Sequence, residues 1–442
     1  MRDIAVSLVV FGLLPYILFR PHWGIYLSAW LGYMNPHRLC YGFALNLPFV
    51  QFAALATLLG LVFSREKKRM IWSGEVILLI IFILWMGVTT LLAFFPDPAL
   101  EQYIKVIKIQ ILTFLAIFLL TSRDKLHTFI WVIALSLGYY GLKGGIFTII
   151  EGGQHRVWGP EGTFIGGNNE LALALLMTIP LFRYLQLQET RKWVQRGLLA
   201  AMLLTAFAAI GSQSRGAMLG MAVMGFSFWL KSRYKLGSAI LVIVGAVGIL
   251  SVMPETWYAR MDTVKTYEED RSAMSRINAW RTAFNIGTDR VTGGGFETFQ
   301  ASVYAQYSPD PTMVFNAHSI YFQVLGEHGF IGLAMFLGLM AMTWFKCSGV
   351  IRRTKQDSEL KWAQDLAAML QVSLLGYASA GAFLGLAYFD YFYHLVAIAV
   401  VLADLVTQRI ASPDAVRADA SATNPYRLAA PAKGKANASR PV

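Results

Sequence analysis

Residues 75–94 read EVILLIIFILWMGVTTLLAF, and Glu75 is the only charged residue in this stretch. An α-helix needs about 20 apolar residues to cross the hydrocarbon core of a membrane. Such stretches recur along the 442 residues, so that 56% of the chain is hydrophobic and 14% is charged, against about 25% charged residues in a soluble chain. We therefore predict an all-α polytopic membrane protein.

This composition excludes an ordinary soluble enzyme, a secreted disulfide scaffold and a disordered chain. A β-barrel is disfavoured because the apolar runs are continuous and do not alternate with period two. The net charge is +12, but most basic residues lie in short loops between apolar runs, so we expect orientation in a membrane and no nucleic-acid binding. Cys40 and Cys347 form no motif, and we predict neither a structural disulfide nor a cysteine metal site.

The alternation of apolar runs and basic loops predicts about twelve transmembrane helices. Every second short loop is basic, and the positive-inside rule places such loops in the cytoplasm. The loops at 95–103, 150–168, 212–215 and 254–317 then face outward. Ten helices follow the basic loop at 64–69, and we expect them near 75–94, 104–121, 127–149, 170–185, 198–211, 216–230, 236–253, 319–345, 366–385 and 388–407.

An even number of helices before the basic loop places both termini in the cytoplasm. Residues 5–19 and 46–63 are apolar, and no clear small-residue cleavage site follows the first, so we expect a retained helix there. The stretch at 24–34 is short and is expected to lie partly at the interface. The predicted regions are transmembrane helices over 1–253, a large outward loop with short helices over 254–317, C-terminal transmembrane helices over 318–410 and a disordered cytoplasmic tail over 411–442.

The loop at 254–317 is the chief asymmetry of the predicted bundle. Loops of this length are usually functional or disordered, and the many aromatic residues of this one favour folding against the membrane. Arg276, Trp280 and Phe284 are spaced at i, i+4 and i+8, as on a short helix. The run Gly293-Gly294-Gly295 predicts a turn.

His318 lies where this loop re-enters the membrane, in the sequence FNAHS (315–319). Tyr321 and Phe322 follow at i+3 and i+4, and we expect them on the same helix face as the histidine. A neutral imidazole at this boundary can accept a proton near pH 7. The alternative interpretation is an interfacial residue that is satisfied by water.

Arg215 lies in SQSRG (212–216), a minimal outward turn between two apolar runs. A charge held there is costly unless it is solvated or paired. The planar guanidinium suits a phosphate because it donates two parallel hydrogen bonds. The alternative is that the side chain extends to the lipid headgroups.

The glycine-rich loop at 150–168 contains a second candidate for binding a polyanion, Arg156. Glycines let a backbone approach a ligand closely. Asn168 and Asn169 end the loop and are expected to cap the following helix, unless they line the site. Lys143 is flanked by glycines near the outer end of its helix and is a further candidate for lining the same cavity.

Other ionisable residues are predicted to pair within the bundle. Glu327 and His328 lie inside an expected helix, which favours buried polar pairing for both. Asp390 and His394 are four residues apart, and we favour pairing with each other over a role in the site. The acidic run at 268–270 could bind a divalent cation, but such runs are more often solvated, and no metal site is predicted.

Together these features indicate a helical bundle with an outward cavity, several arginines and one well-placed histidine. Arginines favour a phosphate or pyrophosphate, and the membrane favours one that is linked to a lipid. A histidine base could activate a hydroxyl group that displaces this leaving group.

At this point the sequence resembles the O-antigen ligase and polymerase superfamily, most clearly over residues 150–335. Residues 1–150 resemble the N-terminal region of ligases that are associated with exosortase loci, including the stretch YGLKGG (140–145). The resemblance elsewhere is carried by Arg156, Gly162, NNELA (168–172), SQSRG (212–216), Ser275-Arg276, Trp280, GGG (293–295), Phe299, NAHS (316–319), Gly326, Gly329 and Gly332.

The resemblance implies a glycosyltransferase C-type membrane fold with one long periplasmic loop. It implies transfer of a glycan from undecaprenyl diphosphate to a sugar of the lipid A core, at the periplasmic face of a bacterial inner membrane. The transfer would invert the anomeric carbon and require no metal, cofactor or nucleotide sugar. The expected partners are the lipid-linked glycan, the lipid A core acceptor and membrane lipids.

The resemblance also assigns roles to residues. The essential histidine of the family corresponds to His318, the acceptor-activating base, and its outward arginine to Arg215, which would clamp the diphosphate. Arg156 and Arg276 are expected to bind the diphosphate as well. Residues expected to line the site are Asn168, Asn316, Tyr321, Trp280 and Lys143.

Two alternatives remain at the level of sequence. The first is another enzyme of the same superfamily, either an O-antigen polymerase or a ligase that glycosylates protein. The second is a transporter of lipid-linked glycans. Transporters often show internal repeats and broken helices at the membrane midplane, whereas here no repeat is visible and the polar cluster is expected at the outer face.

Overall fold

The computed structural model describes residues 1–231, 235–237, 240, 254–255, 258 and 271–411. The regular secondary structure of these residues is helical throughout. Eight of these helices are long and apolar enough to cross a membrane by length and composition, which makes the chain a polytopic membrane protein. The expected helix at 236–253, the acidic run at 268–270 and the expected tail at 411–442 lie outside the described residues, apart from 236, 237, 240 and 411.

The described helices divide at the gap in the described residues. Those before it are α1 (Arg2–Phe19), α2 (His22–Tyr33), α3 (Phe49–Phe63), α4 (Gly74–Leu91), α5 (Pro96–Leu119), α6 (Arg123–Ile150), α7 (Asn168–Gln188), α8 (Lys192–Gly211) and α9 (Arg215–Lys231). Those after it are α12 (Arg271–Asp289), α13 (Ala301–Tyr307), α14 (Ile320–Arg353), α15 (Lys361–Gly381) and α16 (Asp390–Ala411). Short 3₁₀ helices are η1 (Pro36–Leu39), η2 (Phe43–Asn46) and η3 (Ser358–Leu360).

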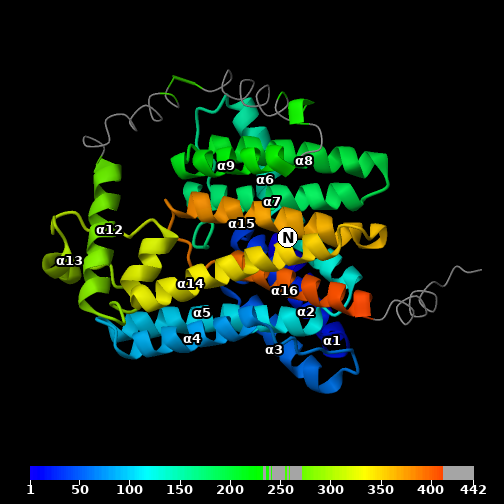
Figure 1. Ribbon diagram of the computed structural model, residues 1–442, viewed down its shortest axis with the longest axis horizontal. Coiled ribbons are helices and arrows are strands. Elements are labelled where there is room, and N and C mark those ends of the chain that lie inside the picture. Colours follow the sequence, from blue (N-terminus) through cyan, green and yellow to red (C-terminus); the bar gives the residue numbers. More distant parts are fainter. Residues whose placement is uncertain (232–234, 238–239, 241–253, 256–257, 259–270, 412–442) are drawn as a thin grey trace, which may run out of the picture.

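The long helices form one bundle, and α12 stands across one of its ends (Figure 1). Helix α8 packs against α6 and α7, and α15 packs against α7 and α9. On the other side, α4 packs against α14 and α5 packs against α16. Helix α7 lies between α8 and α15, and every residue from Leu171 to Phe182 is buried. A helix that is apolar all round either spans a membrane or is buried in a core, and α7 is buried in the centre of the bundle.

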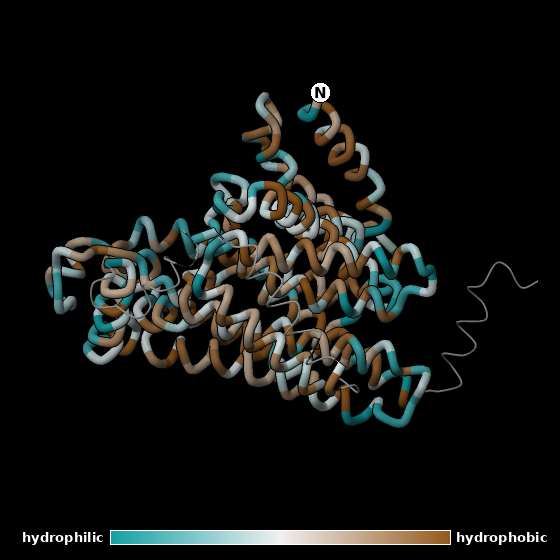
Figure 2. Tube along the Cα trace, turned by 90° about the horizontal axis from the view of Figure 1, so that it is seen from above, coloured by the Kyte–Doolittle hydropathy of each residue, from teal (hydrophilic) through white to brown (hydrophobic). Residues whose placement is uncertain are grey.

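Figure 2 shows hydrophobic residues along the helices of the bundle and hydrophilic residues gathered in the connections at their ends. The first helices form a smaller unit, in which α1 and α3 pack with α2 around a separate core that includes Val10, Ile17 and Ala53. Helix α2 was expected to lie partly at the interface. It is buried over most of its length, between α3 and α6, and Tyr33 near its end is fully buried.

The predicted helices near 75–94, 104–121 and 127–149 are present, but the second begins earlier than expected. Helix α5 starts at Pro96, within the predicted outward loop at 95–103. Proline suits the first turn of a helix because its missing N–H has no partner there in any case. Pro96 therefore marks the start of a helix and does not belong to an extended loop.

Charged contacts gather at one end of the bundle, here called the basic end. Glu66 contacts His22 and Lys125, each at 2.5 Å, and Arg69 pairs with Asp404 at 2.9 Å. Burial raises the pKa of Glu66, but the hydrogen bonds from His22 and Lys125 outweigh it and lower the pKa to about 2. Segments far apart in sequence are thus tied together where the basic loops meet.

The other end of the bundle carries the connections that were predicted to face outward. The backbone N–H of Phe94 donates to the carbonyl of Gly294 at 2.8 Å, and the Arg290 guanidinium donates to the carbonyl of Leu92 at 2.6 Å. These contacts bring the α4–α5 connection against the segment after α12. We call this end the site end, because the cavities described below lie there.

Helix α14 is kinked at Gly329, whose φ of 67° and ψ of −173° are not helical. The turn at 293–295 docks onto this kink, as the N–H groups of Gly294 and Gly295 donate to the carbonyls of Gly326 and Glu327 at 2.8 and 2.9 Å. The turn predicted from the three glycines is therefore present, and it is paired with the kink.

Replacement of Gly293 by alanine is expected to destabilise the protein. Gly293 has a φ of 66°, and an added Cβ would lie 2.6 Å from the Gly329 nitrogen. We expect a loss of about 1–3 kcal/mol in the free energy of unfolding from the backbone conformation alone. Gly197→Ala is the matched control, because Gly197 has open space around it and lies in α8, where alanine is favoured over glycine by about 0.5–1 kcal/mol. Thermal unfolding in detergent measures both, and equal shifts for the two variants would contradict the prediction.

Candidate functional site

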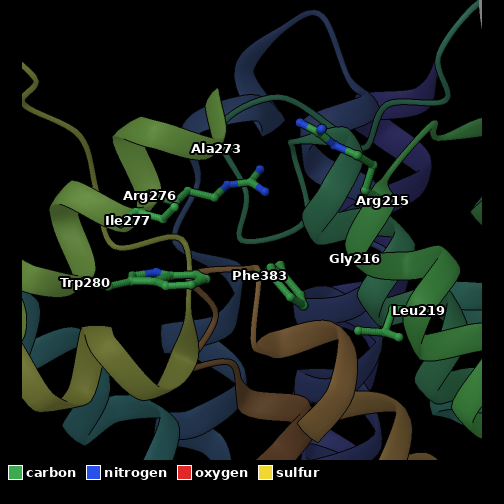
Figure 3. A pocket seen from close by; sticks show the side chains of 8 residues that line it. All are labelled: Arg215, Gly216, Leu219, Ala273, Arg276, Ile277, Trp280 and Phe383. Carbon is green, nitrogen blue, oxygen red and sulfur yellow. The ribbon is translucent and has the colours of Figure 1, made fainter. Parts of the chain in front are cut away.

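A cavity of about 390 Å³ lies at the site end, between α9 and α12. Two arginines enter it from opposite walls, Arg215 from α9 and Arg276 from α12, with Trp280 and Phe383 below them (Figure 3). The cavity is lined by Arg215, Gly216, Leu219, Ala273, Arg276, Ile277, Trp280 and Phe383. We refer to it as the arginine cavity.

The turn that precedes Arg215 fixes its position at the start of α9. Gln213 adopts a left-handed φ of 56°, and the Ser214 hydroxyl accepts a hydrogen bond from the N–H of Ala217 at 3.3 Å. This is the pattern of an N-cap, and it leaves Arg215 in the first helical turn. A helix N-terminus favours negative charge, so its dipole and the guanidinium attract the same kind of ligand.

The next residue, Gly216, permits a close helix contact. A Cβ at this position would lie 3.1 Å from the Cβ of Phe383 and 3.3 Å from the carbonyl oxygen of Ala380. A larger residue would push α9 away from α15 and from the segment that follows it. The SRG sequence (214–216) thus positions Arg215 and also allows the close packing against Phe383, which forms part of the cavity wall.

Arg156 and Asn168 both contact the turn before Arg215. The Arg156 Nε–H donates to the Gln213 side-chain carbonyl at 3.4 Å, and the Asn168 amide donates to the carbonyl of Ser212 at 2.8 Å. Asn168 was expected to cap α7. It lies inside the first turn of that helix instead, with Gly167 at the N-cap, and its amide links α7 to the α8–α9 turn.

Helix α12 confirms the spacing prediction for Arg276, Trp280 and Phe284. Arg276 and Trp280 line the arginine cavity, and Phe284 lines a neighbouring cavity of about 410 Å³ that also contains Trp280. The Trp280 ring stacks on Phe322, with centroids 5.0 Å apart and an angle of 9° between the ring planes. One helix thus spans both cavities with a single face.

A polar cavity of about 120 Å³, distinct from the two above, surrounds His318. We refer to it as the histidine cavity. Its lining combines carboxylates, amides and the imidazole, and contains Glu170, Glu297, Phe299, Asn316, Ala317, His318, Gln323, Glu327 and Gly385.

His318 does not share a helix face with Tyr321 and Phe322, contrary to expectation. The histidine has a left-handed φ of 44°, and α14 begins only at Ile320, after Ser319 at the N-cap. The chain therefore turns sharply at His318, and its side chain enters the cavity before the helix starts. Tyr321 is not among the residues that line either cavity, and its hydroxyl donates to the carbonyl of Ala378 at 2.7 Å.

The environment of His318 keeps its imidazole neutral. Burial lowers the pKa of His318 below its ordinary value of 6.5, and the positive charge of Arg276 lowers this pKa further. The two cavities adjoin, because Trp280 in the wall of the arginine cavity donates a hydrogen bond to the carbonyl of Ala317 in the wall of the histidine cavity. The arrangement places a neutral proton acceptor near the positive charge of Arg276.

Lys143 is exposed on α6, and Arg156 is exposed in the loop at 150–168. Neither lines the arginine cavity or the histidine cavity. Arg156 nevertheless contacts Gln213, two residues before Arg215. Asn316 lines the histidine cavity.

The buried ionisable residues pair, but not all with the expected partners. Glu327 accepts a hydrogen bond from the Tyr388 hydroxyl at 2.5 Å, and the His328 Nδ1 lies 2.7 Å from the Thr89 hydroxyl. Buried pairing is thus confirmed for both. His394 was expected to pair with Asp390, but its Nδ1 is hydrogen-bonded to the hydroxyl of Tyr33.

The segment at 382–389 lines both cavities and was not recognised in the sequence. The expected helix at 366–385 ends at Gly381, and Phe383 and Gly385 then form parts of the two cavity walls. The glycines at 381 and 385, four residues apart in an apolar run, were the available signal. Residues of the histidine cavity that the predictions omitted are Glu170, Glu297, Phe299, Gln323 and Glu327.

Among the described residues, no group of three or more histidine, cysteine, aspartate or glutamate side chains has the geometry of a metal site. The acidic run at 268–270 lies outside them.

Two protein families match the chain. Residues 1–190 match a family of unknown function (DUF5935), and residues 200–337 match the O-antigen ligase family. No curated protein matches the chain. The second match contains Arg215, Arg276 and His318, the three residues that the structure brings to adjoining cavities at one end of a membrane bundle. This match supports membership of the chain in the O-antigen ligase superfamily.

Proposed function

We propose that this protein is an O-antigen ligase, which transfers a glycan from undecaprenyl diphosphate to a sugar of the lipid A core in lipopolysaccharide biosynthesis. The observation that carries the proposal is the placement of Arg215 and Arg276 on opposite walls of one cavity, next to a neutral His318. The resemblance of YGLKGG (140–145) supports the branch that is associated with exosortase loci, and the family supports a glycosyltransferase C-type fold.

The arginine cavity suits a lipid diphosphate in both of its chemical parts. Arg215 and Arg276 can each donate two hydrogen bonds to phosphate oxygens, and the α9 N-terminus adds partial positive charge. The remaining lining is apolar and includes Leu219, Ile277 and Phe383, which suits the first isoprenoid units of the carrier. Arginines here would stabilise the negative charge that grows on the leaving oxygen.

The histidine cavity suits the acceptor. Carboxylates such as Glu170 and Glu297 would repel a phosphate but accept hydrogen bonds from sugar hydroxyl groups. In the proposed reaction, His318 takes the proton of the acceptor hydroxyl as its oxygen forms a bond to the anomeric carbon. The bond from this carbon to the diphosphate oxygen breaks, the diphosphate leaves with the electron pair, and the configuration inverts.

The proposed orientation puts the site end in the periplasm and the basic end in the cytoplasm of a bacterial inner membrane. The contacts of Glu66, Lys125, Arg69 and Asp404 support this, because they gather the Lys- and Arg-rich loops at one end. In this orientation, α12 and α13 belong to the predicted periplasmic loop, and the site opens toward the compartment in which both substrates are exposed.

The test is transfer in vitro, with the purified full-length protein, undecaprenyl-diphosphate glycan and lipid A core, without nucleotide and with EDTA. We expect glycosylated lipid A in the wild type, and its loss in His318→Ala. Longer lipid-linked glycan without glycosylated lipid A would contradict the ligase and identify a polymerase. Absence of both products, although the donor binds, would contradict the ligase in favour of a protein acceptor or transport.

The pH dependence of transfer is expected to follow His318. The imidazole must be neutral to accept a proton, and its pKa lies below 6.5, so activity is retained at neutral pH and lost as the pH falls through this lowered pKa. Arg276→Gln removes one of the two causes of the lowering and is expected to move the acid limb to higher pH. Initial rates of each enzyme, normalised to its own plateau, measure the shift. An acid limb that stays in place would contradict the electrostatic contact between the two residues.

A further inference from the structure

We infer that Trp280 is a positioning residue. It fixes the backbone of His318 and thereby sets the position of this base relative to Arg276, the diphosphate-binding residue that lies on the same helix as Trp280. This inference rests on the proposed function, because it assigns the base to His318 and the diphosphate to the arginine cavity. The residue acts through the backbone on one side of the base, since its indole N–H bonds to Ala317 and its ring stacks on Phe322.

The backbone at His318 needs external support. A left-handed φ of 44° is unfavourable for a residue with a Cβ, and it persists only where the surroundings hold it. Both neighbours are buried, Ala317 with 2% and Ser319 with 1% of its surface exposed. The Trp280 indole N–H donates to the carbonyl of Ala317 at 2.8 Å, directly before the strained residue.

The whole segment that leads to the base is attached to α12. The amide of Asn285 donates to the carbonyl of Tyr307 at 2.8 Å, and the amide of Asn278 donates to the carbonyls of Asp310 and Met313 at 2.8 and 3.1 Å. Trp280 makes the last of these bonds. Side chains of one helix thus hold the segment at four successive points.

The same helix carries Arg276, one turn before Trp280. Residues at i and i+4 lie on one face of a helix, and both of these line the arginine cavity. The Trp280 ring is itself fixed by its stacking on Phe322 at 5.0 Å. The fixed spacing of Arg276 and Trp280 along one helical turn therefore sets the position of the Arg276 guanidinium relative to the backbone next to His318.

The variant Trp280→Phe tests this inference. Phenylalanine keeps an aromatic ring against Phe322 but has no N–H to donate to Ala317. We expect kcat to fall by about 10–100-fold, because a misplacement of about 1 Å at a reacting group can cost about 10²-fold. The KM for the donor and inhibition by inorganic pyrophosphate should not change, since the arginines remain.

Trp85→Phe is the matched control. The Trp85 indole N–H donates to the carbonyl of His328 at 2.9 Å, so this variant loses the same kind of hydrogen bond to another carbonyl of the same region. Its kcat should remain that of the wild type. Equal losses of kcat in the two variants would overturn the inference, as would a change in Trp280→Phe that is confined to the donor KM.

The pH profile separates positioning from a loss of folded protein. A lower amount of active enzyme reduces all rates equally and leaves the acid limb in place. Displacement of His318 from its buried position beside Arg276 should instead move the acid limb toward 6.5, the ordinary pKa of histidine. A limb that stays in place in Trp280→Phe would overturn the inference. A wild type that makes no transfer product would overturn the proposed function, whereas a wild type that transfers and a Trp280→Phe that matches it would overturn only this inference.

Discussion

Replacement of His318 by alanine is expected to lower the rate of glycan transfer by about 10²–10⁴-fold, the contribution of a well-placed general base. The imidazole is neutral in the folded protein and lines the only polar cavity that adjoins the arginine cavity among those described above. Its removal leaves the acceptor hydroxyl without a proton acceptor at the moment of bond formation. Initial rates with saturating donor and acceptor measure the loss.

The folded structure should survive this change. Alanine also adopts a left-handed φ with difficulty, but the bonds from α12 to the preceding segment remain. His155→Ala is the control, because His155 is exposed, lies in the loop at 150–168 and lines neither cavity. Inhibition by pyrophosphate should be unchanged in both variants. Wild-type transfer by a well-folded His318→Ala protein would show that the base lies elsewhere.

Arg215→Lys is expected to lower kcat by about 10²–10³-fold, as does the loss of one preorganised donor to a developing negative charge. Lysine keeps the charge but cannot donate two parallel hydrogen bonds from a planar group. Arg215 is fixed in the first turn of α9 by the capped turn before it, and the close approach of Gly216 to Phe383 leaves little freedom for a different side chain to compensate. Transfer rates and pyrophosphate inhibition both measure the effect.

The control for a general change of positive charge is Arg191→Gln. Arg191 is exposed, pairs with Glu189 at 2.9 Å and lies between α7 and α8, on the connection at the basic end. Its loss should leave transfer unchanged. If Arg215→Lys transfers glycan like the wild type, the guanidinium reaches lipid headgroups and does not clamp the donor.

Local sequence was sufficient to predict most transmembrane helices. A run such as 75–94 has one stable solution in a membrane, because its backbone must bond to itself. Local spacing was also sufficient for α12, where Arg276 and Trp280 recur at the interval of a helical turn. The packing of α2 against α3 and α6 could not be predicted in this way, because a hydropathy pattern does not identify the partners of a helix.

The finer structure of the site depends on contacts that are distant in sequence. The left-handed turn at His318 is supported by the hydrogen bond from Trp280 to Ala317, two residues that are 37 apart in sequence, and no property of FNAHS alone predicts it. Likewise, asparagine is a common helix cap, but the amide of Asn168 donates a hydrogen bond to the carbonyl of Ser212, 44 residues away. The side-chain types indicated which residues can take part in binding or catalysis, and tertiary packing determined what each of them contacts.

The hydrogen bond from Asn168 to Ser212 has a consequence for how such enzymes can be recombined. Asn168 and Glu170 belong to the region that matches a family of unknown function, whereas Ser212 and His318 belong to the ligase match. Glu170 and His318 nevertheless line one cavity. A chimera that joins the first half of one relative to the second half of another would therefore have a hybrid cavity wall, and acceptor choice would be inherited from both parents.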